Sequence, residues 1–363
     1  MPAGEAGIGK AGMEWLQERT FITGREMRMF KTRLTEMLGI PHPIMMGGMQ
    51  LLSTAEFTAA AANAGVMAFL AAETFPSPEA LREEIRKTRR LTDRPFGVNI
   101  SMLPDTGRGE RSLTFAGIAA DEKVAAVETA GSDPAFLVPI LKEAGVRVFH
   151  KVPSIRFARK AVAGGVDGII IVGFECGGHP GMDDVPLSII LPRAVDELPV
   201  PVIAAGGIAD ARGFASALCL GADGVLMGTR FVVTEESTMC ESIKKRYLEI
   251  TENDTTLIMR SLKNPFRCYK NSATKRVLEM EARGASLLEL LTVVGGQVSR
   301  DTYAKGDPDG VPVACSLGAA LIHDVKPIAD VVNDIVEGAH AILSRLRSME
   351  EPGTGTRAGA ARA

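Results

Sequence analysis

Cysteine is scarce in this 363-residue chain, and its five cysteines are scattered without a CxxC pair. The five histidines likewise form no HxH or HExxH pattern. Because structural zinc sites need closely spaced Cys and His ligands, we expect no metal site. Scattered cysteines also favour a reducing compartment, so we expect a cytoplasmic protein. Cys219 falls in an apolar helical segment and is expected in the core.

Long apolar runs and an excess of one charge are also missing. No run approaches the roughly 20 apolar residues that span a bilayer, and residues 1–28 hold no apolar stretch typical of a signal peptide. The net charge is only -3, so no overall field attracts nucleic acid or an anionic membrane. We expect a small-molecule substrate, no nucleic-acid or membrane partner, and a monomer or homodimer. Small and charged residues predict a flexible N-terminal extension at 1–28 and a disordered tail at 350–363.

Short apolar runs alternate with amphipathic helical patterns from residue 43 to residue 227. Parallel strands need crossover connections, and eight strand–helix repeats close a barrel. A doubly wound sheet would usually show GxGxxG after its first strand, whereas this chain has Gly47-Gly48-Met49-Gln50 there. We therefore predict an α/β fold, a (β/α)8 TIM barrel. The predicted strands are 43–48, 67–71, 96–100, 125–129, 147–152, 168–172, 202–205 and 224–227, and the predicted helices are 53–63, 77–90, 111–121, 134–144, 154–163, 187–197 and 209–220.

Two helix starts carry capping signals. Ser53 with Glu56 three residues later predicts a capping box, and Ser77 before Pro78 predicts a cap with proline at the first helical position.

The alternation ends after the eighth strand. Residues 235–312 are more polar and helical, with candidates at 242–252 and 273–282, and predict an added helical subdomain over one side of the barrel. The barrel itself is assigned to residues 29–234 and 313–349.

The basic segment 260–270 has interleaved aromatic residues. It is read as a solvated face, with nucleic-acid binding and arginines lining an active-site entrance as the alternatives.

The sixth strand leads into Gly173-Phe-Glu-Cys-Gly-Gly-His-Pro-Gly181. The glycines let backbone approach a ligand closely, and His179 has an unperturbed pKa near neutrality. Three roles stay open for His179: an acid/base or substrate-orienting group, a donor to a phosphate or ring, and a satisfied loop histidine. Glu175 could orient His179 or cap a loop. Cys176 is not expected to be a nucleophile, because its glycine neighbours indicate that small size is the requirement there.

The turns after the seventh and eighth strands form the sharpest signal. Active sites of such barrels lie at the C-terminal ends of the strands, and these two turns often bind phosphate. Gly206-Gly207 and Gly228-Thr229 each precede a helix whose bare amides can bind an anion. The alternative is that these glycines serve tight turns alone.

The remaining strand ends offer groups for the rest of such a ligand. Lys151 could stabilise an anionic reduced flavin or form a surface ion pair, and its neighbour His150 must face the other side of the strand. Asn99 and Ser101 offer hydrogen bonds. Met49 could cover a flat ring or fill the core. A barrel that binds a phosphorylated sugar without flavin is the alternative of another class.

These positions together resemble the nitronate monooxygenase superfamily over about residues 30–349. The matching sequence motifs are His-Pro-Ile-Met-x-Gly-Gly-Met-Gln, Pro-Phe-Gly-Val-Asn, Gly-x-Glu-Cys-Gly-Gly-His, Gly-Gly-Ile and Met-Gly-Thr-Arg. The resemblance implies an FMN-dependent (β/α)8 barrel with an added helical domain. Residues 173–184 and 257–264 further resemble the branch of bacterial NADH:quinone reductases.

The resemblance implies an FMN-dependent oxidoreductase. Within the superfamily it favours an NAD(P)H:quinone reductase, with NADH or NADPH as co-substrate. A nitronate monooxygenase acting on alkyl nitronates with O2 is the alternative, and an enoyl-thioester reductase is a third. His179 would lie near the reactive edge of the flavin, where the similarly placed histidine of nitronate monooxygenases is the catalytic base. Phe75 stands where the quinone reductase branch is expected to have glutamine. The implied FMN ligands are Gly48, Met49, Gln50, Ser101, Lys151, Gly178, Ala205, Gly206, Gly207, Gly228 and Thr229, with Asn99 added by its place on strand three.

Overall fold

Eight parallel strands close into a barrel in the order β1 to β8, as predicted. The computed structural model describes residues 29–102 and 109–350, so the predicted extension at 1–28 and the tail after residue 350 lie outside the described residues. Five strands have the predicted bounds, and the ends of the other three differ by one or two residues. The strands are β1 Ile44–Met46, β2 Met67–Ala71, β3 Gly97–Met102, β4 Ala126–Gly131, β5 Arg147–Val152, β6 Gly168–Val172, β7 Val202–Ala205 and β8 Gly224–Met227.

The barrel closes because β1 pairs with both β2 and β8, with Met46 opposite Met227. Alternate residues of the strands point inward and form a compact apolar cluster that includes Phe69 and Phe149. These two rings fit because glycine stands beside each of them: a Cβ at Gly97 would lie 2.7 Å from the Phe69 ring, and one at Gly168 would lie 2.5 Å from the Phe149 ring. Side chains therefore fill the barrel interior, as in other barrels of this type.

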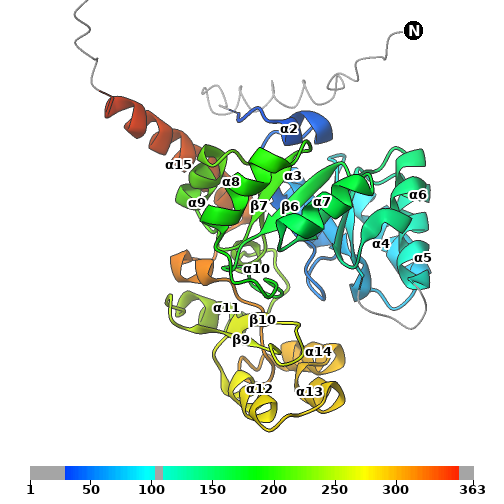
Figure 1. Ribbon diagram of the computed structural model, residues 1–363, viewed down its shortest axis with the longest axis vertical. Helices are drawn as coiled ribbons and strands as arrows, with labels where there is room; N and C mark the ends of the chain where they lie inside the picture. Colours follow the sequence, from blue (N-terminus) through cyan, green and yellow to red (C-terminus); the bar gives the residue numbers. More distant parts are fainter. Residues whose placement is uncertain (1–28, 103–108, 351–363) are drawn as a thin grey trace, which may run out of the picture.

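The helices surround the barrel (Figure 1). In the described part of the chain, no helix combines the length and apolar content that a membrane span needs. The helices of the barrel part are α2 Arg33–Leu38, α3 Ala55–Asn63, α4 Pro78–Leu91, α5 Glu110–Asp121, α6 Val138–Glu143, α7 Ile155–Ala163, α8 Leu187–Glu197, α9 Ala211–Cys219, α10 Thr229–Val232 and α15 Ile328–Ser348, with short 3-10 turns η1 Ala72–Thr74, η2 Pro134–Phe136 and η3 Leu317–Leu321.

One of the two predicted helix caps is present. Ser77 Oγ accepts a hydrogen bond from Ala80 N at the start of α4. The predicted capping box at Ser53 is wrong, because α3 begins after Thr54 and Ser53 Oγ instead accepts from Met49 N.

Two further helix predictions need correction. The helix predicted at 134–144 is divided into η2 and α6, because Pro139 lacks an amide and restricts the residue before it. Cys219 is exposed rather than in the core, since it is the last residue of α9.

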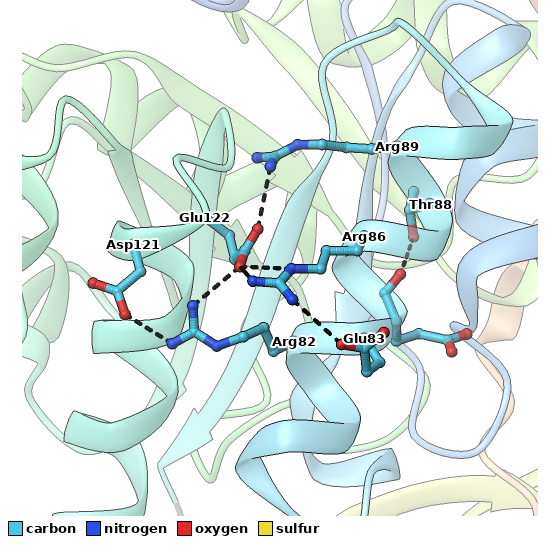
Figure 2. A network of polar contacts seen from close by, with 8 residues as sticks. Arg82, Glu83, Arg86, Thr88, Arg89, Asp121 and Glu122 are labelled. Atoms are coloured by element: carbon cyan, nitrogen blue, oxygen red, sulfur yellow. Dashed lines mark hydrogen bonds and ion pairs between the residues drawn. The ribbon is translucent and has the colours of Figure 1, made fainter.

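A network of arginines ties α4 to the end of α5 (Figure 2). The largely buried carboxylate of Glu122 forms ion pairs with Arg82, Arg86 and Arg89 at 3.0, 3.1 and 3.3 Å. Arg82 also forms an ion pair with Asp121 at 2.8 Å. The network holds two neighbouring helices together on the side of the barrel, and its cations are largely balanced by these carboxylates.

The segment after β8 contains a β-hairpin that the sequence did not predict. Its antiparallel strands pair Phe266 with Ile258, and they pack with the following helices into a small separate core. Figure 1 shows this unit below the barrel, away from α2 and α15. Its elements are α11 Glu241–Leu248, β9 Thr255–Ile258, β10 Phe266–Tyr269, α12 Ser272–Ala282, α13 Leu287–Val294 and α14 Gly296–Lys305.

Candidate active site

A buried carboxylate joins three strand ends at the mouth of the barrel. Glu128 on β4 is fully buried, and its Oε1 accepts from Lys151 Nζ on β5 at 2.7 Å. Its Oε2 accepts from the amide of Gly48 after β1 at 3.0 Å. The predicted residues Gly48 and Lys151 are therefore held together by an acid that was absent from the predicted site.

The charge of Glu128 also decides the protonation of Lys151. Burial alone would lower the pKa of this ammonium, but the Glu128 charge and hydrogen bond outweigh burial and raise the pKa above its usual value. Lys151 therefore remains a cation across the physiological range. One of its three donors goes to Glu128.

The turn after β1 has its shape because Asn99 packs against it. A Cβ at Gly48 would lie 2.2 Å from the Asn99 Cβ, so only glycine fits there. Asn99 is buried, and its Oδ1 accepts from Ser101 Oγ at 3.3 Å. Protein packing alone thus explains the glycine, and Asn99 and Ser101 form one polar pair behind the turn.

The next two residues of this turn, Met49 and Gln50, lie near different parts of the fold. A Cβ at Gly228 would lie 3.7 Å from Met49 Sδ, which places Met49 beside the turn after β8. Gln50 is exposed, and its Nε2 would lie 3.8 Å from a Cβ at Gly296, the first residue of α14. The β1 turn therefore bridges the barrel mouth and the added helical segment.

The turns after β7 and β8 expose unpaired backbone donors. Gly206 and Gly207 have φ of 112° and 72°, which favours glycine at both positions. Within residues 29–102 and 109–350, the amides of Gly206, Gly207, Gly228 and Thr229 donate to no protein acceptor. Thr229 Oγ1 accepts from Ser316 N at 3.1 Å, so its own O–H is free to donate.

After β7, the unpaired amides belong to the glycine turn and not to the start of the next helix, where we had predicted them. We expected bare amides at a helix start after β7, but Asp210 Oδ1 already caps α9 by accepting from Arg212 N and Gly213 N. The available donors at this turn are therefore those of Gly206 and Gly207.

A segment far along the chain completes this region. A Cβ at Gly318 would lie 2.3 Å from the Gly207 carbonyl oxygen, and one at Gly177 would lie 2.7 Å from Ser316 N. The stretch 315–318 thus lies between the β6 and β7 turns, and it carried no recognisable signal in the sequence.

His179 is fixed by the segment that leads into β10. Its Nδ1 lies 3.0 Å from the Pro265 carbonyl oxygen, and a carbonyl can only accept, so Nδ1 carries the proton. Phe266 packs edge-on against the ring at 5.1 Å between centroids. His179 is accessible in the open mouth, yet desolvation by its surroundings lowers the pKa, and the Lys151 charge adds to this effect. Nε2 is therefore an unprotonated acceptor at neutral pH.

The neighbours of His179 have structural roles. Of the two roles left open for Glu175, the structure supports the cap, because both carboxylate oxygens accept from Leu187 N at the start of α8. Burial raises the pKa of the Cys176 thiol to about 11, which makes it a poor nucleophile at neutral pH.

His150 and Lys151 face opposite sides of β5, as expected. His150 is buried, its Nδ1 lies 2.9 Å from Thr129 Oγ1, and burial lowers its pKa to about 4. Lys151 is the member of the pair that reaches Glu128 at the mouth of the barrel.

Sequence reasoning missed Glu128, and it connected the segment 260–270, which includes Pro265 to Arg267, with the site only as an alternative to a solvated face. An acid within the apolar stretch Ala-Ala-Val-Glu-Thr at 125–129 was a usable signal, because a charged residue inside a buried strand needs a partner. The contact between Pro265 and His179 spans 86 residues and has no local signature.

Comparison with known proteins places this chain in a family. A family model described as nitronate monooxygenase matches residues 31–338. Two curated relatives are named (3aS,4S,5R,7aS)-5-hydroxy-7a-methyl-1-oxo-octahydro-1H-indene-4-carboxyl-CoA dehydrogenase. The protein from Mycobacterium tuberculosis is 37% identical over 287 residues, 77% of this chain and 78% of the relative. The protein from Rhodococcus jostii is 36% identical over 274 residues, 73% of this chain and 75% of the relative.

A solved structure extends the likeness over the whole fold. FabK from Thermotoga maritima superposes with a TM-score of 0.81 at 32% sequence identity, covering 88% of this chain and 99% of that chain. Together, the family match, the closed barrel and the relatives show that this chain belongs to the nitronate monooxygenase family of oxidoreductases.

Proposed function

We propose that this chain is an FMN-dependent NAD(P)H:quinone oxidoreductase, with a nicotinamide dinucleotide as electron donor and a quinone as acceptor. The observation that carries this proposal is the state of His179. Its Nδ1–H donates a hydrogen bond to the Pro265 carbonyl. Because its pKa is lowered, the ring is neutral at pH 7 and Nε2 is a hydrogen-bond acceptor. The carboxamide of nicotinamide offers N–H donors to match, whereas the reactive end of a nitronate offers only oxygen acceptors.

The strand ends fit FMN. The four unpaired amides after β7 and β8 are suited to hold its phosphate, because backbone N–H groups at these turns bind anions in barrels of this type. FMN, when bound, supplies the two-electron relay between donor and acceptor. The residues that we propose for its site are Gly48, Met49, Gln50, Asn99, Ser101, Lys151, Gly178, Ala205, Gly206, Gly207, Gly228 and Thr229.

We propose different roles for Lys151 and His179, namely charge stabilisation and substrate orientation. Lys151, kept protonated by Glu128, provides a fixed positive charge that favours negative charge accumulating in the mouth. His179 stays neutral above its depressed pKa and orients the donor through Nε2. We infer that His179 acts on the substrate as an acceptor rather than as a proton donor.

The two motifs of the quinone reductase branch support this choice, because they contact each other. Asp184, at the end of the first motif, forms a two-point ion pair with Arg260 of the second, with both distances 2.9 Å. The residues that resemble this branch therefore form one structural unit beside His179.

A second candidate is an oxidoreductase of CoA thioesters. It is favoured by the names of the two relatives with 36% and 37% identity, which act on a carboxyl-CoA. The same hydride-accepting site would serve either reaction, so substrate identity needs a direct test.

Anaerobic rapid mixing separates the candidates. The oxidised holoenzyme is mixed with NADH, NADPH, propionate 3-nitronate or butyryl-CoA, and the flavin absorbance is followed. Then the reduced enzyme is mixed with benzoquinone or crotonyl-CoA. We expect NADH or NADPH to bleach the flavin and benzoquinone to restore it. Bleaching by the nitronate but by neither nicotinamide overturns the proposal, and bleaching by butyryl-CoA or reoxidation by crotonyl-CoA alone selects the thioester reaction.

A further inference from the structure

Arg267 in β10 is a buried cation that forms no ion pair with any described residue, although the charges of Glu175 and Asp184 act on it from a distance. Only 4% of its surface is exposed, and among the described residues it forms no ion pair with a carboxylate. Its Nε and Nη2 donate to the Phe174 carbonyl at 3.2 and 3.1 Å, and Nη1 donates to Thr255 Oγ1 at 3.0 Å. Burial lowers its pKa. An arrangement of this kind is costly, because burial of a charge is normally offset by an opposite charge.

This guanidinium holds the loop that carries His179. It binds the Phe174 carbonyl with two donors and lies 4.3 Å over the centre of the Phe174 ring. The Arg267 backbone binds the other end of the same loop, since Arg267 N donates to Gly178 O at 2.6 Å and Gly178 N donates to Arg267 O at 3.0 Å. One residue thus fixes both ends of the loop from Phe174 to Gly178.

The same short segment also fixes the ring. The carbonyl of Pro265, two residues before Arg267, accepts a hydrogen bond from His179 Nδ1, and Phe266 packs against the ring edge. His179 directly follows Gly178, so contacts with β10 and the residue before it position both the main chain and the side chain of His179. A shift of the loop against the hairpin would break the Nδ1 contact and release the proton to either ring nitrogen.

We propose that Arg267 is a positioning residue that fixes the tautomer and orientation of His179. It acts through the loop and the hairpin rather than on the substrate. This inference rests on the proposed function only in taking His179 Nε2 as the acceptor of the donor substrate. The added segment thereby takes part in catalysis, since its first hairpin aligns a residue of the barrel.

The test uses two variants and a matched control. Arg267→Met keeps much of the volume and removes the charge, and Arg267→Lys keeps the charge but loses the planar fork that binds one carbonyl twice. The control is Arg246→Met, which removes a partly exposed arginine of the same segment that pairs with Glu249 at 3.1 Å.

Nitrogen-15 NMR of the histidine rings reports the tautomer without any substrate. His179 is assigned by the signal lost in His179→Asn. We expect a protonated Nδ1 and an unprotonated Nε2 in the wild type and in Arg246→Met, and averaging of the two nitrogens in both Arg267 variants. Turnover per bound FMN should fall by roughly 10²-fold in Arg267→Met, the size of effect that a small misplacement of a catalytic group produces.

The thermal midpoint distinguishes positioning from support of the fold. We expect Arg267→Met to keep a midpoint close to the wild-type value, because the loss of three side-chain hydrogen bonds is offset by removal of a buried charge that forms no ion pair. An unchanged tautomer in both variants overturns the inference, whether or not turnover falls. If Arg267→Met does not fold, Arg267→Lys decides by the same spectrum. If NADH proves not to be the donor but the tautomer changes, the proposed function fails and the inference stands.

Discussion

Replacing Glu128 by glutamine is the substitution with the largest expected effect on the site. Glutamine keeps the shape and removes the charge that faces Lys151 at 2.7 Å. Burial then acts on the ammonium without opposition, so the Lys151 pKa should fall below its usual value. The amide of Gly48 keeps an acceptor only if the new side chain turns its oxygen toward it.

The expected loss of stability follows from the burial of the pair. Removing one partner of a buried ion pair costs about 3–5 kcal/mol, because the remaining charge stays buried. Glu128 is fully buried, but a quarter of the Lys151 side chain is exposed and water can solvate it in part. We therefore expect a loss of about 3 kcal/mol for Glu128→Gln, at the lower end of that range.

The pH dependence has a definite sign. The Lys151 pKa is raised in the folded state, so the pair stabilises the fold fully below the unfolded pKa of roughly 10.4 and loses this effect as pH rises through the folded value. The gap between wild type and Glu128→Gln should be largest near neutral pH, narrow once pH passes the lowered Lys151 pKa of the variant, and narrow further above about pH 10.4 as the wild-type pair loses its charge.

Urea unfolding of the apoprotein at pH 7.5 and about pH 11 measures both effects without interference from the cofactor. Glu36→Gln is the control, because Glu36 forms an exposed pair with Lys31 at 2.8 Å and should leave the midpoint unchanged. A Glu128→Gln midpoint equal to that of the wild type at pH 7.5 would refute the claim that this carboxylate organises the mouth.

Three further predictions concern packing, thiol reactivity and the helix network. Gly48→Ala should lower the unfolding free energy by about 1–3 kcal/mol in urea, because its Cβ would lie 2.2 Å from a side-chain carbon on β3, whereas Gly117→Ala in open space should not. Iodoacetamide at pH 8 should label the exposed Cys219 and leave Cys176 unmodified in the native protein; rapid labelling of Cys176 would contradict its raised pKa. Glu122→Gln should cost about 1–2 kcal/mol at low salt and less in 1 M NaCl, and a salt-independent loss would argue against an ionic network.

The barrel could be predicted because its strands are short, apolar and separated by regular helical patterns. The runs at 147–152 and 168–172 end where glycine, proline or serine begins, and these sharp boundaries match β5 and β6. The capping box at Ser53 was wrong because a competing contact, Met49 N to Ser53 Oγ, uses the serine side chain in the turn.

The candidate site was predicted best where its residues are close in sequence. Gly206 and Gly207 could be read from a single turn, since positive φ requires glycine there. Glu128 was missed because its role depends on partners 23 and 80 residues away. The hairpin of β9 and β10 was missed because its basic residues read as a solvated surface, while in the fold the Arg267 side chain is buried against the β6 loop.

We propose that the ends of the barrel strands hold FMN, with its phosphate at the β7 and β8 turns. The most direct measurement is the identity and amount of cofactor released by heating the purified protein, compared with the same measurement on Gly228→Ala. A Cβ at Gly228 meets only Met49 Sδ at 3.7 Å, so this variant should fold normally while its side chain narrows the proposed phosphate turn. We predict one FMN per chain in the wild type and a lower occupancy in Gly228→Ala. A colourless protein that does not bind added FMN, or equal FMN occupancy in both proteins, would contradict this placement of the cofactor.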